Sequence, residues 1–256
     1  MQTALPDFII IGAQKCGTTW LWNEIRKHPD IFTPKQKELS YFSNQNRLKS
    51  NDESSIQWYK EFFKNALPEQ IKGEATPCYL FREWSAEKIH QVIADVKLII
   101  ILRQPADRAY SQWRMMRKNK TINDKITFKE CFYGDSIKSQ ETRERGKYHK
   151  QIKRYQSYFK PAQLLILIYD ELLSDYDFFL KKTYDFLNIR NNFRSETASE
   201  FILPRVPHLT DVPTQINTLD KQEITEYYHD SICKLETLLN CSLPEWKNKP
   251  FRKSST

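Results

Sequence analysis

Two glycines, one lysine and two threonines lie close together near the start of the chain, in Gly12-Ala13-Gln14-Lys15-Cys16-Gly17-Thr18-Thr19. Glycines let backbone amides close around a phosphate, lysine adds a positive charge, and threonine hydroxyls donate further hydrogen bonds. The stretch is therefore typical of a loop that binds a phosphorylated group. It differs from the nucleoside-triphosphate loop G-x-x-x-x-G-K-[ST], because its lysine precedes the second glycine and threonine follows that glycine.

This loop needs a strand before it and a helix after it to bind an anion. The apolar run Phe8–Ile11 predicts a buried strand, and the amphipathic run Trp20–Lys27 predicts a helix. The first N–H groups of that helix would point at the loop, together with the positive end of the helix dipole. The alternative is a structural turn with an incidental lysine, since strand-to-helix turns recur in every α/β protein.

Two further apolar runs, Lys97–Arg103 and Leu164–Tyr169, predict buried strands, and each leads into a helical pattern. Continuous apolar strands that each feed a helix are typical of a parallel sheet covered on both faces. We therefore predict an α/β protein with a central, mostly parallel sheet flanked by helices. A chain of 256 residues can bury one large core, so we expect a single domain over residues 1–256.

Ligands of open α/β sheets bind beyond the carboxyl ends of the strands. Here those ends carry the loop after Ile11, Arg103 and Tyr169. Folds that hydrolyse triphosphates often place a magnesium-binding carboxylate at a second strand end, whereas this strand ends in a cation. The pattern favours an anionic ligand held without a metal. Ser111, about two turns into the helix predicted over 106–118, is a candidate second ligand of the same anion.

Composition excludes some classes of protein. A hydrophobic content of 39% with 13% aromatic residues excludes wholesale disorder, and the net charge of +8 favours an anionic partner. The five cysteines form no C-x-x-C pair and have no histidine at metal-ligand spacing, which argues against a disulfide framework or a zinc site. There is no signal-peptide pattern and no apolar run long enough to span a membrane, so we expect a cytoplasmic protein without membrane insertion.

Taken in order, these motifs resemble the sulfotransferase family whose donor is 3′-phosphoadenosine 5′-phosphosulfate (PAPS). Gly12–Trp20 is similar to the family's 5′-phosphosulfate loop, and Leu102–Ser111 to its 3′-phosphate element. Tyr169–Leu172 resembles a tyrosine-acid-acid turn near adenine. Lys37–Phe42 is similar to a segment of the carbohydrate sulfotransferase branch in which glutamate is the base, and Gly73–Pro77 resembles a strand end lining the acceptor site.

The resemblance implies a P-loop-like sulfotransferase fold, with PAPS as cofactor, PAP (3′,5′-adenosine bisphosphate) as its product and no metal. It assigns cofactor binding to the residues Gln14, Lys15, Cys16, Gly17, Thr18, Thr19, Trp20, Arg103, Ser111, Tyr169 and Arg205. Lys15 would neutralise charge on the leaving phosphate, and Glu38 would take the proton of an acceptor hydroxyl. Lys37 would orient Glu38 or hold the sulfonate oxygens.

The acceptor implied is a small molecule or carbohydrate, such as a soluble sugar, a glycolipid or a secondary metabolite, with O-sulfation preferred to N-sulfation. The resemblance places it against the side chains of Tyr41, Phe42, Thr76 and Tyr79. Residues 118–148 are expected to cover the acceptor and residues 190–218 the cofactor. His28 and His149 are alternative bases.

Two other functions are consistent with part of the sequence. A P-loop kinase would use ATP with magnesium, and a basic nucleic-acid-binding protein would use its many lysines. The second leaves the ordered motifs unexplained, so we expect no nucleic-acid partner. The sequence leaves open which acceptor is used, which position is modified and what the oligomeric state is.

Overall fold

A five-stranded, all-parallel sheet forms the centre of the fold, which confirms the predicted α/β class. The structure, a computed structural model, describes residues 5–46, 53–190, 213 and 215–247. The strand order is β2-β3-β1-β4-β5, and every neighbouring pair runs parallel. The strands are β1 Phe8–Gly12, β2 Ile31–Phe32, β3 Ile71–Ala75, β4 Lys97–Leu102 and β5 Leu164–Ile168.

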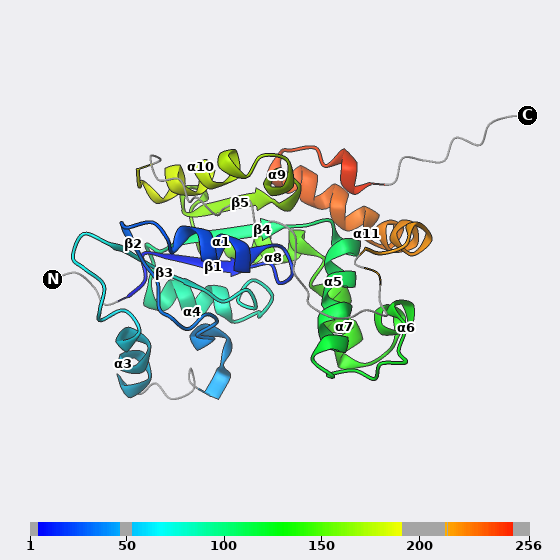
Figure 1. The fold of residues 1–256 in the computed structure, drawn as a ribbon, viewed down its shortest axis with the longest axis horizontal. Helices are drawn as coiled ribbons and strands as arrows, with labels where there is room; N and C mark the ends of the chain where they lie inside the picture. Colours follow the sequence, from blue (N-terminus) through cyan, green and yellow to red (C-terminus); the bar gives the residue numbers. More distant parts are fainter. Residues whose placement is uncertain (1–4, 47–52, 191–212, 214, 248–256) are drawn as a thin grey trace, which may run out of the picture. The chain divides into compact units, whose positions relative to one another are not determined.

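Helices alternate with these strands along the chain (Figure 1). The α-helices are α1 Thr18–Ile25, α3 Glu53–Glu61, α4 Ser85–Val92, α5 Pro105–Lys118, α6 Phe128–Tyr133, α7 Ile137–Glu144, α8 Tyr148–Gln156, α9 Tyr169–Ser174, α10 Tyr176–Leu187 and α11 Thr218–Leu239. Short 3-10 turns are η1 Tyr41–Ser43, η2 Pro161–Gln163 and η4 Pro244–Trp246. Within the described residues, no helix is both long and apolar enough to cross a membrane.

Strands β1 and β4 lie at the centre of the sheet. All residues of β1, and all but the first of β4, are buried, as expected for apolar strands covered on both faces. Strand β3 carries polar residues instead, and it is buried as well. The buried ammonium of Lys72 lies 3.0 Å from Asp7 Oδ2, so an ion pair compensates this charge.

Contacts between the residues gather in two compact units, a division that the sequence analysis did not anticipate. The first unit comprises Met1–Arg103 and Arg154–Val206, and the second Gln104–Lys153 and Pro207–Thr256. The chain passes from one unit to the other just after β4. There Gln104 begins α5 as its N-cap, and its side chain accepts a hydrogen bond from the Asp107 amide over 2.9 Å.

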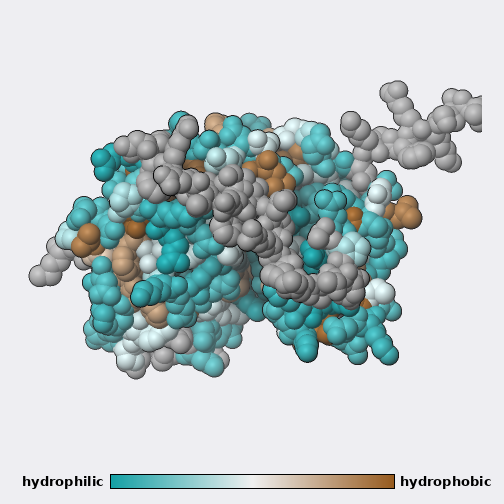
Figure 2. All heavy atoms as spheres, in the orientation of Figure 1, coloured by the Kyte–Doolittle hydropathy of each residue, from teal (hydrophilic) through white to brown (hydrophobic). Residues whose placement is uncertain are grey.

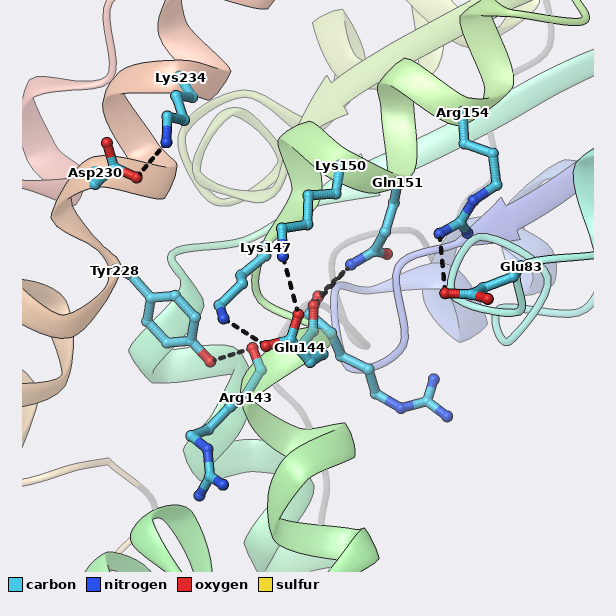
Figure 3. Close-up of polar contacts among 11 residues, drawn as sticks. Glu83, Arg143, Glu144, Lys147, Lys150, Gln151, Arg154, Tyr228, Asp230 and Lys234 are labelled. Carbon is cyan, nitrogen blue, oxygen red and sulfur yellow. Dashed lines mark hydrogen bonds and ion pairs between the residues drawn. The ribbon is translucent and has the colours of Figure 1, made fainter.

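The second unit has its own buried polar core. Arg108 is fully buried, and its guanidinium donates to Gln112 Oε1 over 2.6 Å and to the Thr142 carbonyl over 2.5 Å. The buried Tyr228 hydroxyl donates to the Arg143 carbonyl over 2.9 Å (Figure 3). Figure 3 also shows the Glu144 carboxylate in contact with the ammonium groups of both Lys147 and Lys150.

Hydrophilic residues dominate the face drawn in Figure 2, with hydrophobic residues scattered in small groups over the part of the chain that is described. Large side chains with high exposure include Ile137 at 78% and Leu219 at 76%. Scattered apolar residues of this kind are ordinary on a protein surface. Apolar exposure on this face therefore gives no indication of a binding site.

Close packing of β3 against β1 generates the first prediction. A Cβ added at Gly73 would lie 2.0 Å from Cζ of the buried Phe8 ring. Gly73→Ala should lower the free energy of unfolding by about 1–3 kcal/mol, because the ring has no room to move. Denaturant unfolding measures this loss. Phe8→Leu removes the clashing ring atoms. The double variant should therefore lose less unfolding free energy than the sum of the losses in the two single variants. Strict additivity would contradict the proposed clash.

Candidate active site

The loop after β1 leads directly into the first turn of α1. The Ala13 N–H donates to the Ile101 carbonyl over 2.8 Å, which joins the start of the loop to β4. Lys15 and Gly17 both have left-handed backbones, with φ of 73° and 90°. Gly17 is the N-cap of α1, no side chain caps the helix, and its first turn contains no acidic residue. The positive end of this helix is therefore arranged to receive an anion.

The loop residues differ in exposure. Cys16 and Thr18 are buried, Lys15 is half-buried and Thr19 is exposed at the start of α1. Trp20 is 8% exposed and packs edge-on against Phe179, with the ring centroids 6.0 Å apart. Among the residues described, its indole N–H is buried without a hydrogen-bond partner. Contact of Trp20 with adenine stays a prediction.

The ends of β4 and β5 meet this loop, as the rule for parallel strands predicts. Tyr169, the first residue of α9, packs closely on Gly17. A Cβ added at Gly17 would lie 2.9 Å from Cε2 of the Tyr169 ring. The Arg103 guanidinium carbon lies 4.9 Å from the centroid of the same ring, in cation–π geometry. Burial raises the pKa of Tyr169, and Arg103 opposes that rise. Two of the residues assigned to the cofactor thus lie together.

A lysine–carboxylate pair lies at the neighbouring strand end. Lys37 Nζ is 2.9 Å from Glu38 Oε1, and the Glu38 side chain is 53% exposed. The Glu38 N–H donates to the Ala75 carbonyl over 3.0 Å at the end of β3. Ala75 pairs in register with Ile10 of β1, so this pair belongs to the same sheet edge as the loop. The exposed carboxylate is accessible to an acceptor.

Glu74 lies on β3 beside Ala75, and the sequence analysis gave it no role of its own. It is 1% exposed, and its carboxylate accepts hydrogen bonds from Tyr59, Thr76 and Tyr79. Burial raises its pKa, while these three hydroxyls and the nearby Lys37 charge oppose the rise. An acidic residue inside a predicted strand is a signal in the sequence, because an unpaired carboxylate is rarely buried there.

The four side chains expected to contact the acceptor are all buried, with exposed fractions of 5%, 0%, 0% and 0% for Tyr41, Phe42, Thr76 and Tyr79. Tyr41 stacks on Tyr59 with ring centroids 4.6 Å apart. In this conformation the four side chains pack in the interior of the protein. Their contact with an acceptor stays a prediction.

Some predicted residues are not placed with this edge. Ser111 lies on α5 in the second unit, and Arg205 lies outside the described residues. The His28 ring bonds the Asp30 N–H and the Arg190 carbonyl, each at 3.1 Å, at the end of α1. His149 belongs to the second unit, where burial and the charges of Lys234 and Lys150 lower its pKa. Within the described part of the chain, no cluster of His, Cys, Asp and Glu is suited to hold a metal ion.

Comparison with known proteins gives a consistent result. A family model described as "Sulfotransferase domain" matches residues 5–209. Heparan sulfate glucosamine 3-O-sulfotransferase 5 of Mus musculus is 29% identical over 180 residues, which is 67% of this chain and 50% of that protein. The chain thus spans about half the length of this relative.

Solved structures resemble this fold over nearly its full length. A sulfotransferase from Alicyclobacillus acidocaldarius gives a TM-score of 0.80 at 25% identity, over 95% of this chain and 99% of that one. A mouse sulfotransferase complexed with PAP gives a TM-score of 0.58 at 16% identity, over 94% of this chain and 90% of that one. The second similarity shows a shared fold.

Contact between Gly17 and Tyr169 generates the second prediction. Gly17→Ala should weaken PAP binding about tenfold, because alanine is strained at a left-handed φ by about 1–2 kcal/mol and its methyl group would push on the Tyr169 ring. Isothermal titration with PAP measures the change. Gly73→Ala is the matched control, because it crowds a buried glycine outside the loop and should leave the affinity of the folded protein unchanged. Equal affinities of wild type and Gly17→Ala would show that the loop shape does not matter.

Proposed function

The chain belongs to the sulfotransferase family, and on that premise we propose that it transfers a sulfonate group from PAPS to a hydroxyl of a small-molecule or carbohydrate acceptor. The observation that carries the proposal is that one edge of the sheet holds both a group of residues suited to bind the donor and a carboxylate suited to act as the base. The glycine-containing loop 12–19 follows β1, and Arg103 and Tyr169 follow β4 and β5. The Lys37–Glu38 pair is joined to the end of β3 by the Glu38 N–H bond to Ala75.

On the donor side, the backbone amides from Cys16 to Thr19 and the two threonine hydroxyls would hold the 5′-phosphate. The uncapped first turn of α1 supports this assignment. Lys15 would neutralise the charge that develops on the leaving phosphate. Arg103, with Ser111 and Arg205, would hold the 3′-phosphate, and Tyr169 and Trp20 would lie near adenine. Bound PAPS supplies an activated sulfonate, and the chain's residues position and neutralise it.

On the acceptor side, Glu38 would remove the hydroxyl proton as sulfur is attacked. Its exposed carboxylate and its backbone bond to Ala75 support this role. Lys37 would orient the carboxylate or hold sulfonate oxygens. The name of the mouse relative specifies O-sulfation of a glucosamine in heparan sulfate, which supports a sugar hydroxyl as the first acceptor to test.

Two segments complete the proposal. Residues 118–148, which include α6 and α7, would cover the acceptor, and residues 190–218 would cover the cofactor. Most of the second segment, 191–212 and 214, lies outside the described residues. A cytoplasmic location and the lack of a nucleic-acid partner stay predictions.

Donor choice is the third prediction. PAP should bind without magnesium and more tightly than ATP with magnesium, because the loop lysine and Arg103 match two separate phosphates. Lys15→Ala should weaken PAP binding about 10- to 100-fold through loss of a charge-assisted hydrogen bond. Calorimetric titration measures both. Lys35→Ala, which removes an exposed lysine outside the loop, is the control. Tight binding of ATP only with magnesium would favour a kinase instead.

The role of Glu38 is the fourth prediction. Glu38→Gln should keep PAP affinity but lower turnover about 10²- to 10⁴-fold, because glutamine cannot accept the proton. Turnover is measured with labelled PAPS and a panel of sugars that includes desulfated heparan oligosaccharides, with mass spectrometry for the gain of one sulfonate. Glu61→Gln, an exposed glutamate on α3, is the control. Unchanged turnover in Glu38→Gln would refute this base.

A further inference from the structure

The carboxylate of Glu74 lies at the centre of a buried cluster of hydroxyls. The Tyr59 hydroxyl donates to Glu74 Oε1 over 2.7 Å, and the Tyr79 hydroxyl donates to the same oxygen over 3.0 Å. Thr76 Oγ1 donates to Glu74 Oε2 over 2.7 Å. A buried carboxylate is costly unless such bonds compensate it. Three short hydroxyl bonds around one buried acid indicate a role beyond packing.

Two of these hydroxyls also accept a hydrogen bond from the segment that carries Glu38. The Ser40 N–H donates to Thr76 Oγ1, and the Phe42 N–H donates to the Tyr79 hydroxyl oxygen, each over 3.3 Å. A hydroxyl has one proton, and here that proton goes to Glu74. Its lone pairs therefore face the backbone amide. Glu74 as a carboxylate fixes the direction of both bonds.

Segment 38–42 needs this support because its backbone is strained. Glu38 and Ser40 have φ of 61° and 57°, in the left-handed region that residues other than glycine rarely adopt. Such a conformation persists only when its surroundings hold it. The bonds that hold it are Glu38 N–H to the Ala75 carbonyl, the two amide bonds to the hydroxyls, and Ser85 Oγ to the Phe42 carbonyl over 2.9 Å.

We propose that Glu74 is a positioning residue. Its buried carboxylate, through the hydroxyls of Thr76 and Tyr79, holds segment 38–42 in the conformation that presents Glu38 at the sheet edge. The catalytic consequence rests on the proposed function, in which Glu38 is the base. The conformational claim is independent of that function.

Several groups face the Glu74 carboxylate. They are Tyr59 from α3, Thr76 and Tyr79 from the end of β3, and the Lys37 ammonium from the loop. Burial raises the pKa of Glu74 above its usual value, and these groups oppose the rise. Because the pKa of Glu74 is higher in the folded than in the unfolded chain, protonated Glu74 contributes to the stability of the fold. This contribution is complete below the pKa of the unfolded chain, and it is lost as the pH rises through the pKa of the folded protein. The ionised form of Glu74 is therefore the form that burial disfavours.

Protonation of Glu74 would disturb the two hydrogen-bond relays, from Glu74 through Thr76 to the Ser40 amide and from Glu74 through Tyr79 to the Phe42 amide. A carboxylic acid also donates a hydrogen bond, so one of the three hydroxyls would have to turn away or reverse its bond. Acidification of the wild type should therefore loosen segment 38–42. Glu74→Gln imitates this state at every pH, because an amide nitrogen replaces one acceptor oxygen.

Hydrogen exchange tests the proposal on the ligand-free protein. At about pH 8, Glu74→Gln should speed exchange in peptides spanning 38–42 about tenfold or more, with peptides from β4 unchanged. Tyr59→Phe is the matched control, because the Tyr59 hydroxyl bonds Glu74 but, among the described residues, accepts no hydrogen bond from segment 38–42, so exchange in 38–42 should equal that of wild type. In a pH titration, exchange in 38–42 relative to the intrinsic rate should rise in wild type as the pH falls through the raised pKa of Glu74, and it should not rise in Glu74→Gln.

Two results would overturn the proposal. One is wild-type exchange of 38–42 in Glu74→Gln, and the other is an equal rise in 38–42 and β4, which would indicate a general loss of stability. If Glu74→Gln does not fold, Thr76→Val and Tyr79→Phe each remove one relay and should speed exchange at Ser40 and Phe42 respectively. Unchanged exchange at those amides would count equally against it.

Kinetics separates this inference from the proposed function. With a working acceptor, Glu74→Gln should lower kcat about tenfold and leave the Kd for PAP unchanged. A chain that transfers no sulfonate at all would refute the proposed function, while the exchange results would still decide the role of Glu74.

Discussion

Parallel pairing of β3, β1, β4 and β5 is the constraint on which the site depends. Because all these strands run in the same direction, their carboxyl ends share one edge of the sheet. The loop after β1, Arg103 after β4 and Tyr169 after β5 are brought together by this register. The bond from Glu38 to Ala75 adds a carboxylate from a segment that is not itself a strand. A shift in register would separate these groups.

The edge has two sides with opposite electrostatic character. The side at β1, β4 and β5 carries a helix N-terminus and cations, which suits a doubly phosphorylated donor. The side at β3 carries a carboxylate held by a lysine and by a backbone bond. In the proposed mechanism, proton removal and charge neutralisation thus belong to the ends of different strands. The buried Glu74 is on the second of these strands, and it accepts hydrogen bonds from Thr76 and Tyr79.

Much of this fold could be predicted from the sequence, because β1, β4 and β5 are continuous apolar runs with helices after them. Strand β3 gave only a weak signal, since Lys72, Gly73 and Glu74 interrupt the apolar pattern. The hydroxyl cluster was not predictable, because Tyr59 reaches Glu74 from a separate helix, and periodicity does not report which buried groups meet. The left-handed backbones of Glu38 and Ser40 were also hidden, since neither residue type signals that conformation.

The motif of the loop was the most informative part of the sequence, and its structure explains why. Lys15 and Gly17 both adopt left-handed backbones, and Gly17 leaves room for the Tyr169 ring, so spacing and packing agree. The division into two compact units after Arg103 has no signal in the sequence, because Leu102 to Pro105 is typical of an ordinary strand-to-helix connection.

A crystal structure of the chain with bound PAP would test the central claim most directly. The account predicts the 5′-phosphate within hydrogen-bond distance of the backbone amides from Cys16 to Thr19, and the 3′-phosphate against the Arg103 guanidinium. PAP bound elsewhere, with the loop after β1 free of phosphate, would contradict it.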